Sequence, residues 1–305
     1  FKCLIPDCLQ PIIFSMNDKK YYSWLVVIVL TLLVTPVFAQ ELPGRKMPFV
    51  YPYAARVYDS LAAMRIPLVE VPASRLKTLL PESVDNSTKD CFPGLQDQFQ
   101  FYSCQQYAGV AYTFGYEFNR LRSTIGWYWE NRFPAHYTWN FFNDGERYCG
   151  VNFLHSFDLI SQQGHMTNKY FGEDTSGSNL GWKSGYNKYF SGMPYRLKNV
   201  RAIPINSIDG INTLRNYLYD HLDGSPIGGI ACFTTDSWFE MGILPPGTPE
   251  AGKNVQLWWH PTPDHGLCIV GYNDSIRYDV NGDGQFTNNL DINSDGIVDA
   301  RDWEI

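Results

Sequence analysis

Cys104 stands directly before the segment with the clearest helical pattern in the sequence. From Gln105 onward, apolar residues recur every three or four positions, which predicts a helix with one buried face: Tyr107, Val110, Ala111, Phe114, Phe118 and Leu121. The backbone N–H groups and the dipole at the start of a helix favour negative charge, so they lower the pKa of a thiol placed there. Cys104 is therefore a candidate nucleophile, although a cysteine at a helix start is more often structural.

His265 stands two positions before an apolar run, Leu267–Tyr272, whose composition predicts a strand. A thiolate and an imidazole together can attack a carbonyl carbon and then protonate the leaving group. The other histidines have no metal-ligand spacing, and surface or core roles are expected for them: His136, His155, His165, His221 and His260.

Upstream residues extend this pair into a longer pattern. Asp85 and Gln98 stand 19 and six positions before Cys104. Together with the segment around His265, this pattern resembles the papain family of cysteine peptidases. The resemblance extends from Leu80 to Asp274.

The resemblance implies roles for three side chains. Cys104 would be the nucleophile and His265 the general base and acid, while Gln98 and the backbone N–H of Cys104 would donate hydrogen bonds to the oxyanion. It also implies an α+β, papain-like two-lobe fold and a polypeptide substrate. The helical lobe would carry the cysteine and the β lobe the histidine.

The sequence departs from the family in two places. Phe101 and Tyr102 stand where the family has a cysteine and a glycine, and Gln105 follows the candidate nucleophile where the family has an aromatic residue. The Asn-Ser-Trp stretch that orients the family's histidine does not occur between His265 and Ile305, and Asp236-Ser237-Trp238 precedes the histidine instead of following it. We therefore expect the orienting Asn to lie beyond Ile305.

The acidic C-terminal stretch matches a calcium-binding loop of twelve residues. Gly296 stands at the sharp turn, and oxygen donors occupy the ligand positions: Asp291, Asn293, Asp295, Ile297 (through its carbonyl), Asp299 and Asp302. Upstream, Asp279, Asn281 and Asp283 repeat the first three ligand positions of this loop, and this second loop is incomplete. Asp302 occupies the last ligand position, where EF-hand loops usually have a glutamate. In this respect the loop resembles dockerin loops more than EF-hands. We expect structural Ca²⁺ in an insertion over residues 279–305, and a separate docking module is the weaker alternative.

The N-terminal region has the composition of a secretory signal. Lys19 and Lys20 precede an apolar run of eleven residues, Trp24–Val34, which is shorter than the about 20 residues that span a membrane. We predict upstream read-through over 1–15, a cleaved signal over 16–39, and a proline-rich extension or propiece over 40–79. An uncleaved anchor is the alternative. The mature protein would then be secreted, periplasmic or at the cell surface, with no stable membrane span.

The remaining pattern places helices before strands. Helices are predicted over Val151–Gln163, ended by Gly164, and from Ile208 to Asp223-Gly224, whereas residues 168–196 are expected to be a loop. Strands are predicted over Ile227–Phe233 and Leu267–Tyr272. This order favours an α+β domain over residues 80–278.

Charge and cysteine content limit the classes of partner and compartment. The net charge of −7 and the pI of about 5.3 argue against a nucleic-acid partner. Five of the seven cysteines lie outside the upstream stretch: Cys91, Cys104, Cys149, Cys232 and Cys268. Four cysteines allow three disulfide connectivities, among which the sequence does not choose, and Cys232 and Cys268 fit buried thiols equally well.

These patterns favour an exported, papain-like cysteine peptidase stabilised by calcium. The alternative is a catalytically silent protein of the same fold that binds calcium and holds a peptide or glycan. Modification of Cys104 by a thiol-reactive epoxide would distinguish the two.

Overall fold

The computed structural model describes residues 66–71, 76, 79–143, 145–172, 185–205, 207–235, 240–258, 265–279, 284, 286 and 296. The predicted read-through and signal segments lie outside these residues, as do most of the predicted extension and most of the calcium-loop segment. Within the described part, no helix is both long and apolar enough to cross a membrane.

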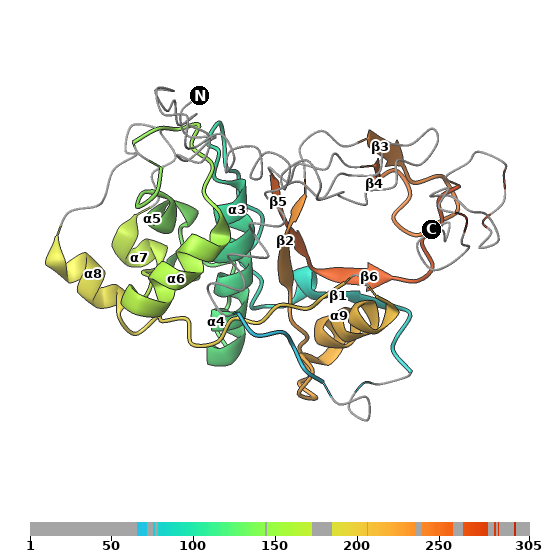
Figure 1. Ribbon diagram of the computed structural model, residues 1–305, viewed down its shortest axis with the longest axis horizontal. Helices are drawn as coiled ribbons and strands as arrows, with labels where there is room; N and C mark the ends of the chain where they lie inside the picture. The colour runs from blue at the N-terminus through green and yellow to red at the C-terminus, as the bar shows by residue number, and fades with distance from the viewer. Residues whose placement is uncertain are drawn as a thin grey trace, which may run out of the picture.

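Helices and strands are mixed along the described chain (Figure 1). The helical elements are η2 (Asn86–Thr88), α3 (Cys104–Gln106), η3 (Tyr107–Phe114), α4 (Gly115–Arg122), η4 (Trp129–Asn131), α5 (Ala135–Trp139), α6 (Phe153–Gln163), α7 (Asn168–Phe171), α8 (Tyr186–Gly192) and α9 (Ile208–Asp220). The strands are β1 (Ser83–Asp85), β2 (Ala231–Thr235), β3 (Glu240–Ile243), β4 (Asn254–Trp258), β5 (His265–Ile269) and β6 (Gly271–Asn273). In Figure 1, α5 to α8 lie on one side of the long helix formed by α3, η3 and α4, and the strands and α9 lie on the other.

The long helix is continuous from Cys104 to Arg122, which confirms the predicted helix. Its predicted face is buried from Tyr107 to Phe114, but Leu121, which was predicted on that face, is 74% exposed because it lies on the last turn. One face packs Val110 and Phe114 against Phe133 and Ile160. Its middle section, η3, is a π-helix, which the periodicity did not predict. There the backbone N–H of Gly115 bonds to the carbonyl of Val110, five residues back instead of four.

Two other helices were predicted close to where they lie. Helix α6 ends at Gln163 before Gly164, whose φ of 85° is a backbone conformation that glycine adopts readily. Helix α9 begins at Ile208 as predicted but ends at Asp220, earlier than expected, because His221 and Leu222 adopt left-handed conformations with φ of 59° and 61°.

The predicted loop over residues 168–196 was wrong for α7 and α8. These short helices are too short to be stable alone, so their stability depends on tertiary contacts. Tyr189 of α8 packs against Tyr137 and Phe141, with ring centroids 6.0 and 6.4 Å apart. The backbone N–H of Asn168, at the start of α7, donates to the carbonyl of Arg132.

The strands form three antiparallel pairs: β1 with β6, β2 with β5, and β3 with β4. The predicted strand over Leu267–Tyr272 is divided, because β5 pairs with β2 whereas β6 turns to pair with β1. The predicted strand over Ile227–Phe233 begins later, at Ala231. A Cβ at Gly228 would lie 1.8 Å from the carbonyl oxygen of Leu218, so this stretch packs directly on the end of α9 instead of pairing in a sheet.

Asn86, next to β1, connects three segments that are far apart in the sequence. Its side chain is buried, and Nδ2 donates to the carbonyl oxygens of Leu218 at 2.7 Å and Gly229 at 2.8 Å. These two hydrogen bonds hold the β1 region, the end of α9 and the approach to β2 together.

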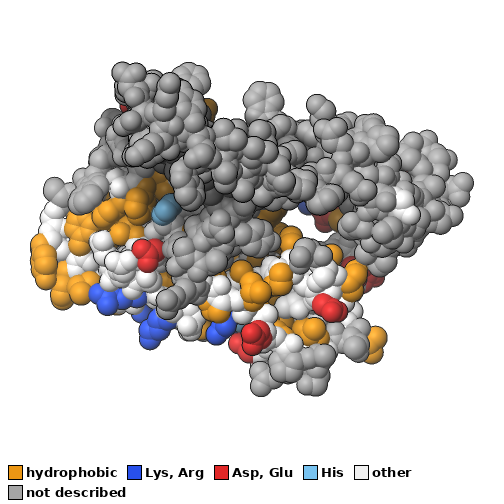
Figure 2. All heavy atoms as spheres, viewed as in Figure 1, with side chains coloured by type: hydrophobic (Ala, Val, Ile, Leu, Met, Phe, Trp, Pro, Cys, Tyr) orange, Lys and Arg blue, Asp and Glu red, His pale blue; other side chains and the backbone are white. Residues whose placement is uncertain are grey.

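The other histidines occupy different environments. His165 is fully buried among aromatic rings, and burial lowers its pKa to about 3. His136 is buried, His155 is exposed, and His221 ends α9. His260 lies outside the described residues. On the face shown in Figure 2, charged side chains of both signs are interspersed with hydrophobic ones over the described part.

Candidate active site

Cys104 is the first residue of α3 and therefore lies at the N-terminus of the long helix. The backbone N–H groups of Gln106 and Tyr107 are used within this turn, where both donate to the carbonyl of Ser103. Cys104 is buried, with 9% of its surface exposed. The backbone N–H groups and the dipole at a helix start favour negative charge on a group placed there.

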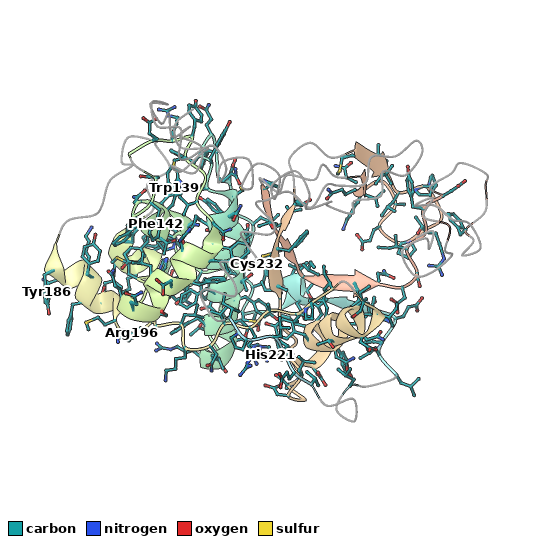
Figure 3. The ribbon with its side chains drawn as sticks, viewed as in Figure 1. Trp139, Phe142, Tyr186, Arg196, His221 and Cys232 are labelled. Carbon is teal, nitrogen blue, oxygen red and sulfur yellow. The ribbon has the colours of Figure 1, made fainter. Side chains whose placement is uncertain are left out.

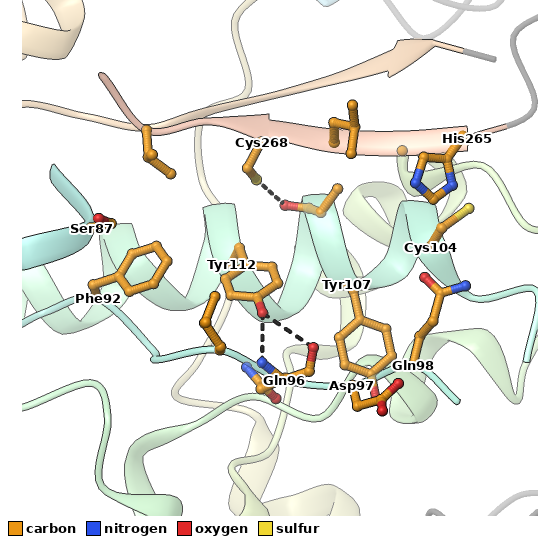
Figure 4. Close-up of a pocket in the computed structure, with 15 residues that line it drawn as sticks. Ser87, Phe92, Gln96, Asp97, Gln98, Cys104, Tyr107, Tyr112, His265 and Cys268 are labelled. Carbon is orange, nitrogen blue, oxygen red and sulfur yellow. Dashed lines mark hydrogen bonds between the residues drawn. The ribbon is translucent and has the colours of Figure 1, made fainter. Parts of the chain in front are cut away.

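A close backbone approach brings β5 to the start of this helix. Gly266 follows His265, and a Cβ at Gly266 would lie 2.6 Å from Cα and 2.9 Å from the backbone nitrogen of Gln105. Only a residue without a side chain allows this approach. As a result, the imidazole of His265 lies above the thiol of Cys104 in Figure 4, and both residues line one cavity.

Gln98 lies on the opposite side of Cys104 from His265 (Figure 4). Its Nε2 donates to the carbonyl of Phe101 at 3.1 Å, and Oδ1 of Asp97 accepts the backbone N–H of Phe99 at 2.7 Å. These bonds hold the loop that presents Gln98 to the cavity. The structure therefore brings together the three side chains to which the resemblance assigned roles.

The cavity has a volume of about 790 Å³ and continues from the thiol along η3. Aromatic and aliphatic side chains form most of its inner lining, among them Phe92, Tyr107, Tyr112 and Val270. Asp97 is a charged residue of the lining and is itself exposed. The volume is within the range of sites that bind small ligands or side chains of larger ones.

No protein-family model and no curated protein sequence matches the chain. Among solved structures, it is similar to xylellain, a cysteine protease from Xylella fastidiosa, with 14% identity and a TM-score of 0.45 over 70% of this chain and 78% of that one. It is also similar to digestive procathepsin L 3 from the larval midgut of Tenebrio molitor, with 14% identity and a TM-score of 0.42 over 71% of this chain and 64% of that one. At this level of similarity, a functional assignment depends on the residues of the cavity.

Tyr112 supports the cavity in a way that the sequence pattern did not indicate. Its hydroxyl accepts the backbone N–H of Gln96 at 2.8 Å, which ties the Gln98 loop to η3. Burial raises the pKa of Tyr112, so the hydroxyl stays neutral. The helical periodicity identified Tyr107 but not Tyr112, because Tyr112 faces the loop and not the main apolar cluster.

Both side chains beside Cys104 are buried, and of the two only Gln105 differs from the family pattern. The side-chain oxygens of Ser103 and Gln105 have no hydrogen-bond partner among the described residues. An unsatisfied buried oxygen costs about 1–3 kcal/mol. The stretch Asp236-Ser237-Trp238 lies outside the described residues.

Of the predicted calcium ligands, only Asp279 lies within the described residues. Its Oδ2 accepts the backbone N–H of Gly284 at 2.6 Å. Gly284 and Gly296, at the turn positions of the two predicted loops, have φ of 82° and 83°. Asn281, Asp283, Asp291, Asn293, Asp295, Ile297, Asp299 and Asp302 are not described, and no metal-binding cluster of acidic, His or Cys side chains occurs among the residues that are.

Proposed function

We propose that this chain is a papain-like cysteine peptidase, which cleaves a polypeptide substrate by attack of the Cys104 thiolate on the scissile peptide bond. The observation that supports it best is the juxtaposition of Cys104, His265 and Gln98 in one cavity. Each comes from a different local structure, namely a helix start, a strand start and a loop. A purely structural cysteine would not require this combination.

The chemistry follows from the positions of these groups. The thiolate of Cys104 attacks the carbonyl carbon of the scissile peptide bond, and the oxyanion accepts hydrogen bonds from the Gln98 amide and the backbone N–H of Cys104. The imidazolium of His265 gives its proton to the departing amine. Neutral His265 then takes a proton from water, which attacks the thioester and releases the acid product and the thiolate.

Labelling with a thiol-reactive epoxide tests this proposal directly. We expect the epoxide to modify the wild-type protein at Cys104, which peptide mapping would locate. Peptide hydrolysis should be lost with the same rate constant as the modification of Cys104. His265→Ala should slow both the epoxide reaction and peptide hydrolysis by at least about 100-fold, whereas the control His155→Ala, at an exposed position, should slow neither reaction. Loss of a main oxyanion donor in Gln98→Ala should lower kcat by roughly 10²–10³.

Failure of Cys104 to react in a folded protein would contradict the peptidase proposal. It would favour the catalytically silent, peptide- or glycan-binding alternative. Retention of the epoxide reaction in His265→Ala would show that the thiol reacts without the imidazole, and would remove His265 from the mechanism.

We further propose that structural Ca²⁺ stabilises the segment over residues 279–305, which follows the strand pair of the site. The hydrogen bond from Gly284 to Asp279 supports a turned loop at the first candidate site. Calcium titration followed by calorimetry should show binding, and chelation should lower Tm. Asp295→Asn should weaken binding at the complete loop, whereas the exposed control Asp158→Asn should not; an unchanged Tm on chelation would contradict the proposal.

Export of the protein is the third part of the proposal and is supported by the sequence before Gln40. N-terminal sequencing of the mature protein should begin near Gln40 if the signal is cleaved. A mature N-terminus at or before Met16 would contradict signal cleavage and favour the uncleaved anchor.

A further inference from the structure

Two cysteines stand directly opposite each other in the strand pair that carries His265. Cys232 of β2 and Cys268 of β5 are partners in the antiparallel register. Opposed residues in such a pair have Cα atoms about 4.5–5.5 Å apart and point to the same face of the sheet. A disulfide requires Cα atoms about 4.4–6.8 Å apart, so the backbone positions fit one.

Both thiols face the same side chain on the long helix. The sulfur of Cys268 lies 3.3 Å from Oγ1 of Thr113, and the Thr113 hydroxyl also hydrogen-bonds to Cys232. Figure 3 shows Cys232 in the region between β2 and the long helix. A shared hydroxyl contact places the two sulfurs on one side of the sheet and close to each other.

The other cysteines of the described chain lie elsewhere. Cys91 packs with Phe92 and Tyr116, and the sulfur of Cys149 contacts the carbonyl of Phe142. Cys104 lies at the active site. Cys232 and Cys268 are therefore the pair that the strand register brings together.

We propose that Cys232 and Cys268 form a disulfide across β2 and β5 when the protein matures in an oxidising compartment. The sequence allowed several pairings, and the register selects this one. The proposal rests on the proposed export, because secreted proteins meet disulfide oxidants whereas cytosolic proteins are kept reduced. It does not depend on peptidase activity.

The bond would form by thiol–disulfide exchange with a small-molecule or protein disulfide. One cysteine thiolate attacks a sulfur of the oxidant and displaces one thiolate from it. The second cysteine thiolate then attacks the mixed disulfide and releases the other, so the cysteines lose two protons and two electrons and the oxidant leaves as two thiols. Both cysteines are thiols in the structure described here.

Burial determines when this exchange takes place. Burial raises the pKa of Cys232 to about 11 and also raises the pKa of Cys268, so little thiolate exists in the folded protein. The exchange therefore belongs to folding, before the sheet closes on η3. Once formed, the buried bond would resist reduction in the native state.

The bond would hold the strand on which the catalytic histidine is positioned. Cys268 follows His265 by three positions on β5 and lines the same cavity. The two cysteines are 36 positions apart in the sequence, and the intervening chain contains β3 and β4. A bond there constrains a long loop of the unfolded chain, which is how disulfides stabilise.

Peptide mapping without reductant tests the bond. The full chain is exported or refolded in a glutathione redox buffer, unfolded, alkylated with iodoacetamide and digested. We expect a cross-linked peptide joining Cys232 to Cys268, whereas Cys91, Cys104 and Cys149 should carry the alkyl group. Alkylation of Cys232 and Cys268 in both preparations would overturn the proposal.

A stability measurement provides a second, independent test. Reduction should lower Tm of the wild type by roughly 5–10 °C. The same reductant should leave Tm of the double variant Cys232→Ala/Cys268→Ala unchanged, and the control Cys149→Ala should still respond. Epoxide labelling of Cys104 in parallel separates the disulfide proposal from the peptidase proposal, because a missing disulfide leaves the epoxide reaction of Cys104 intact.

Discussion

Oε2 of Glu117 lies 2.9 Å from Nε2 of His221, which connects α4 to the residue that ends α9. The same carboxylate accepts a hydrogen bond from Nε of Arg120 at 3.0 Å, and its other oxygen accepts one from the hydroxyl of Tyr217. His221 appears between the helical and strand-containing sides in Figure 3. The carboxylate of Glu117 therefore joins α4 to the end of α9.

The first prediction is a pH-dependent contribution of Glu117 to stability. Burial opposes ionisation of this carboxyl, but hydrogen bonds and charge from His221 and Arg120 outweigh it and lower the pKa of Glu117 below its ordinary value of 4.5. A lowered folded-state pKa stabilises the fold above the unfolded-state pKa, and this stability is lost as pH falls through the folded-state pKa. Glu117→Gln should cost about 1–3 kcal/mol at pH 7, and this cost should shrink as the pH falls through the lowered pKa of Glu117.

Urea unfolding of both proteins at several pH values measures this difference. Glu130→Gln, at an exposed position, is the matched control and should change stability by less than about 0.5 kcal/mol at every pH. An equal effect of the two substitutions at pH 7 would show that the buried carboxylate does not stabilise the fold.

The second prediction concerns the close approach of β5 to the long helix. Gly266→Ala places a methyl group 2.6 Å from Cα of Gln105, so the strand must move and carry His265 away from Cys104. We expect the rate of Cys104 alkylation and kcat/KM to fall by at least about 10-fold, since a displacement of 1 Å can cost far more. Gly150→Ala, where a Cβ meets no atom within 4 Å, should leave both rates unchanged.

The third prediction tests Tyr112 as a positioning residue. Tyr112→Phe removes the acceptor for the backbone N–H of Gln96, so the loop that carries Gln98 becomes less fixed. Steady-state kinetics should show a lower kcat with a smaller change in KM, because an oxyanion donor acts mainly in the transition state. Tyr128→Phe, at an exposed position, should not change kcat; an unchanged kcat in Tyr112→Phe as well would mean that the loop does not need this bond.

The fourth prediction concerns Asn86. Asn86→Ala removes two donated hydrogen bonds and leaves the carbonyl oxygens of Leu218 and Gly229 buried. We expect a loss of about 2–4 kcal/mol in the free energy of unfolding, measured by urea titration. Asn187→Ala, on an exposed face of α8, should cost less than about 1 kcal/mol, and a similar loss in both variants would contradict the role given to Asn86.

The long helix and the meeting of Cys104 with His265 could be predicted because each has a local or family-like sequence signal. Apolar periodicity indicates the buried face of the helix, and the spacing of Gln98 to Cys104 indicates the loop. The π-helical section has no such signal. It depends on contacts made after folding: Oγ1 of Thr113 and the sulfur of Cys268 both donate to the carbonyl of Ala108.

Other elements were missed because their stability comes from distant parts of the chain. Helix α8 is held by rings of Tyr137 and Phe141, and the carboxylate of Glu117 meets a histidine 104 positions later. Strands β3 and β4 were not predicted either, although polar and apolar residues alternate in β4 from Asn254 to Leu257. A single sequence shows propensity and periodicity, but it does not show which distant groups will become neighbours.

The pairing of β1 with β6 has a consequence for the order of events during synthesis. Residues 83–85 hydrogen-bond to residues 271–273, and Asn86 bonds to carbonyls 132 and 143 positions away. Strand β1 therefore has no partner strand until β6, nearly 200 residues later in the chain, has been synthesised. Such non-local contacts slow folding, so β1 must stay unpaired, and accessible to oxidants and chaperones, until β6 emerges from the ribosome.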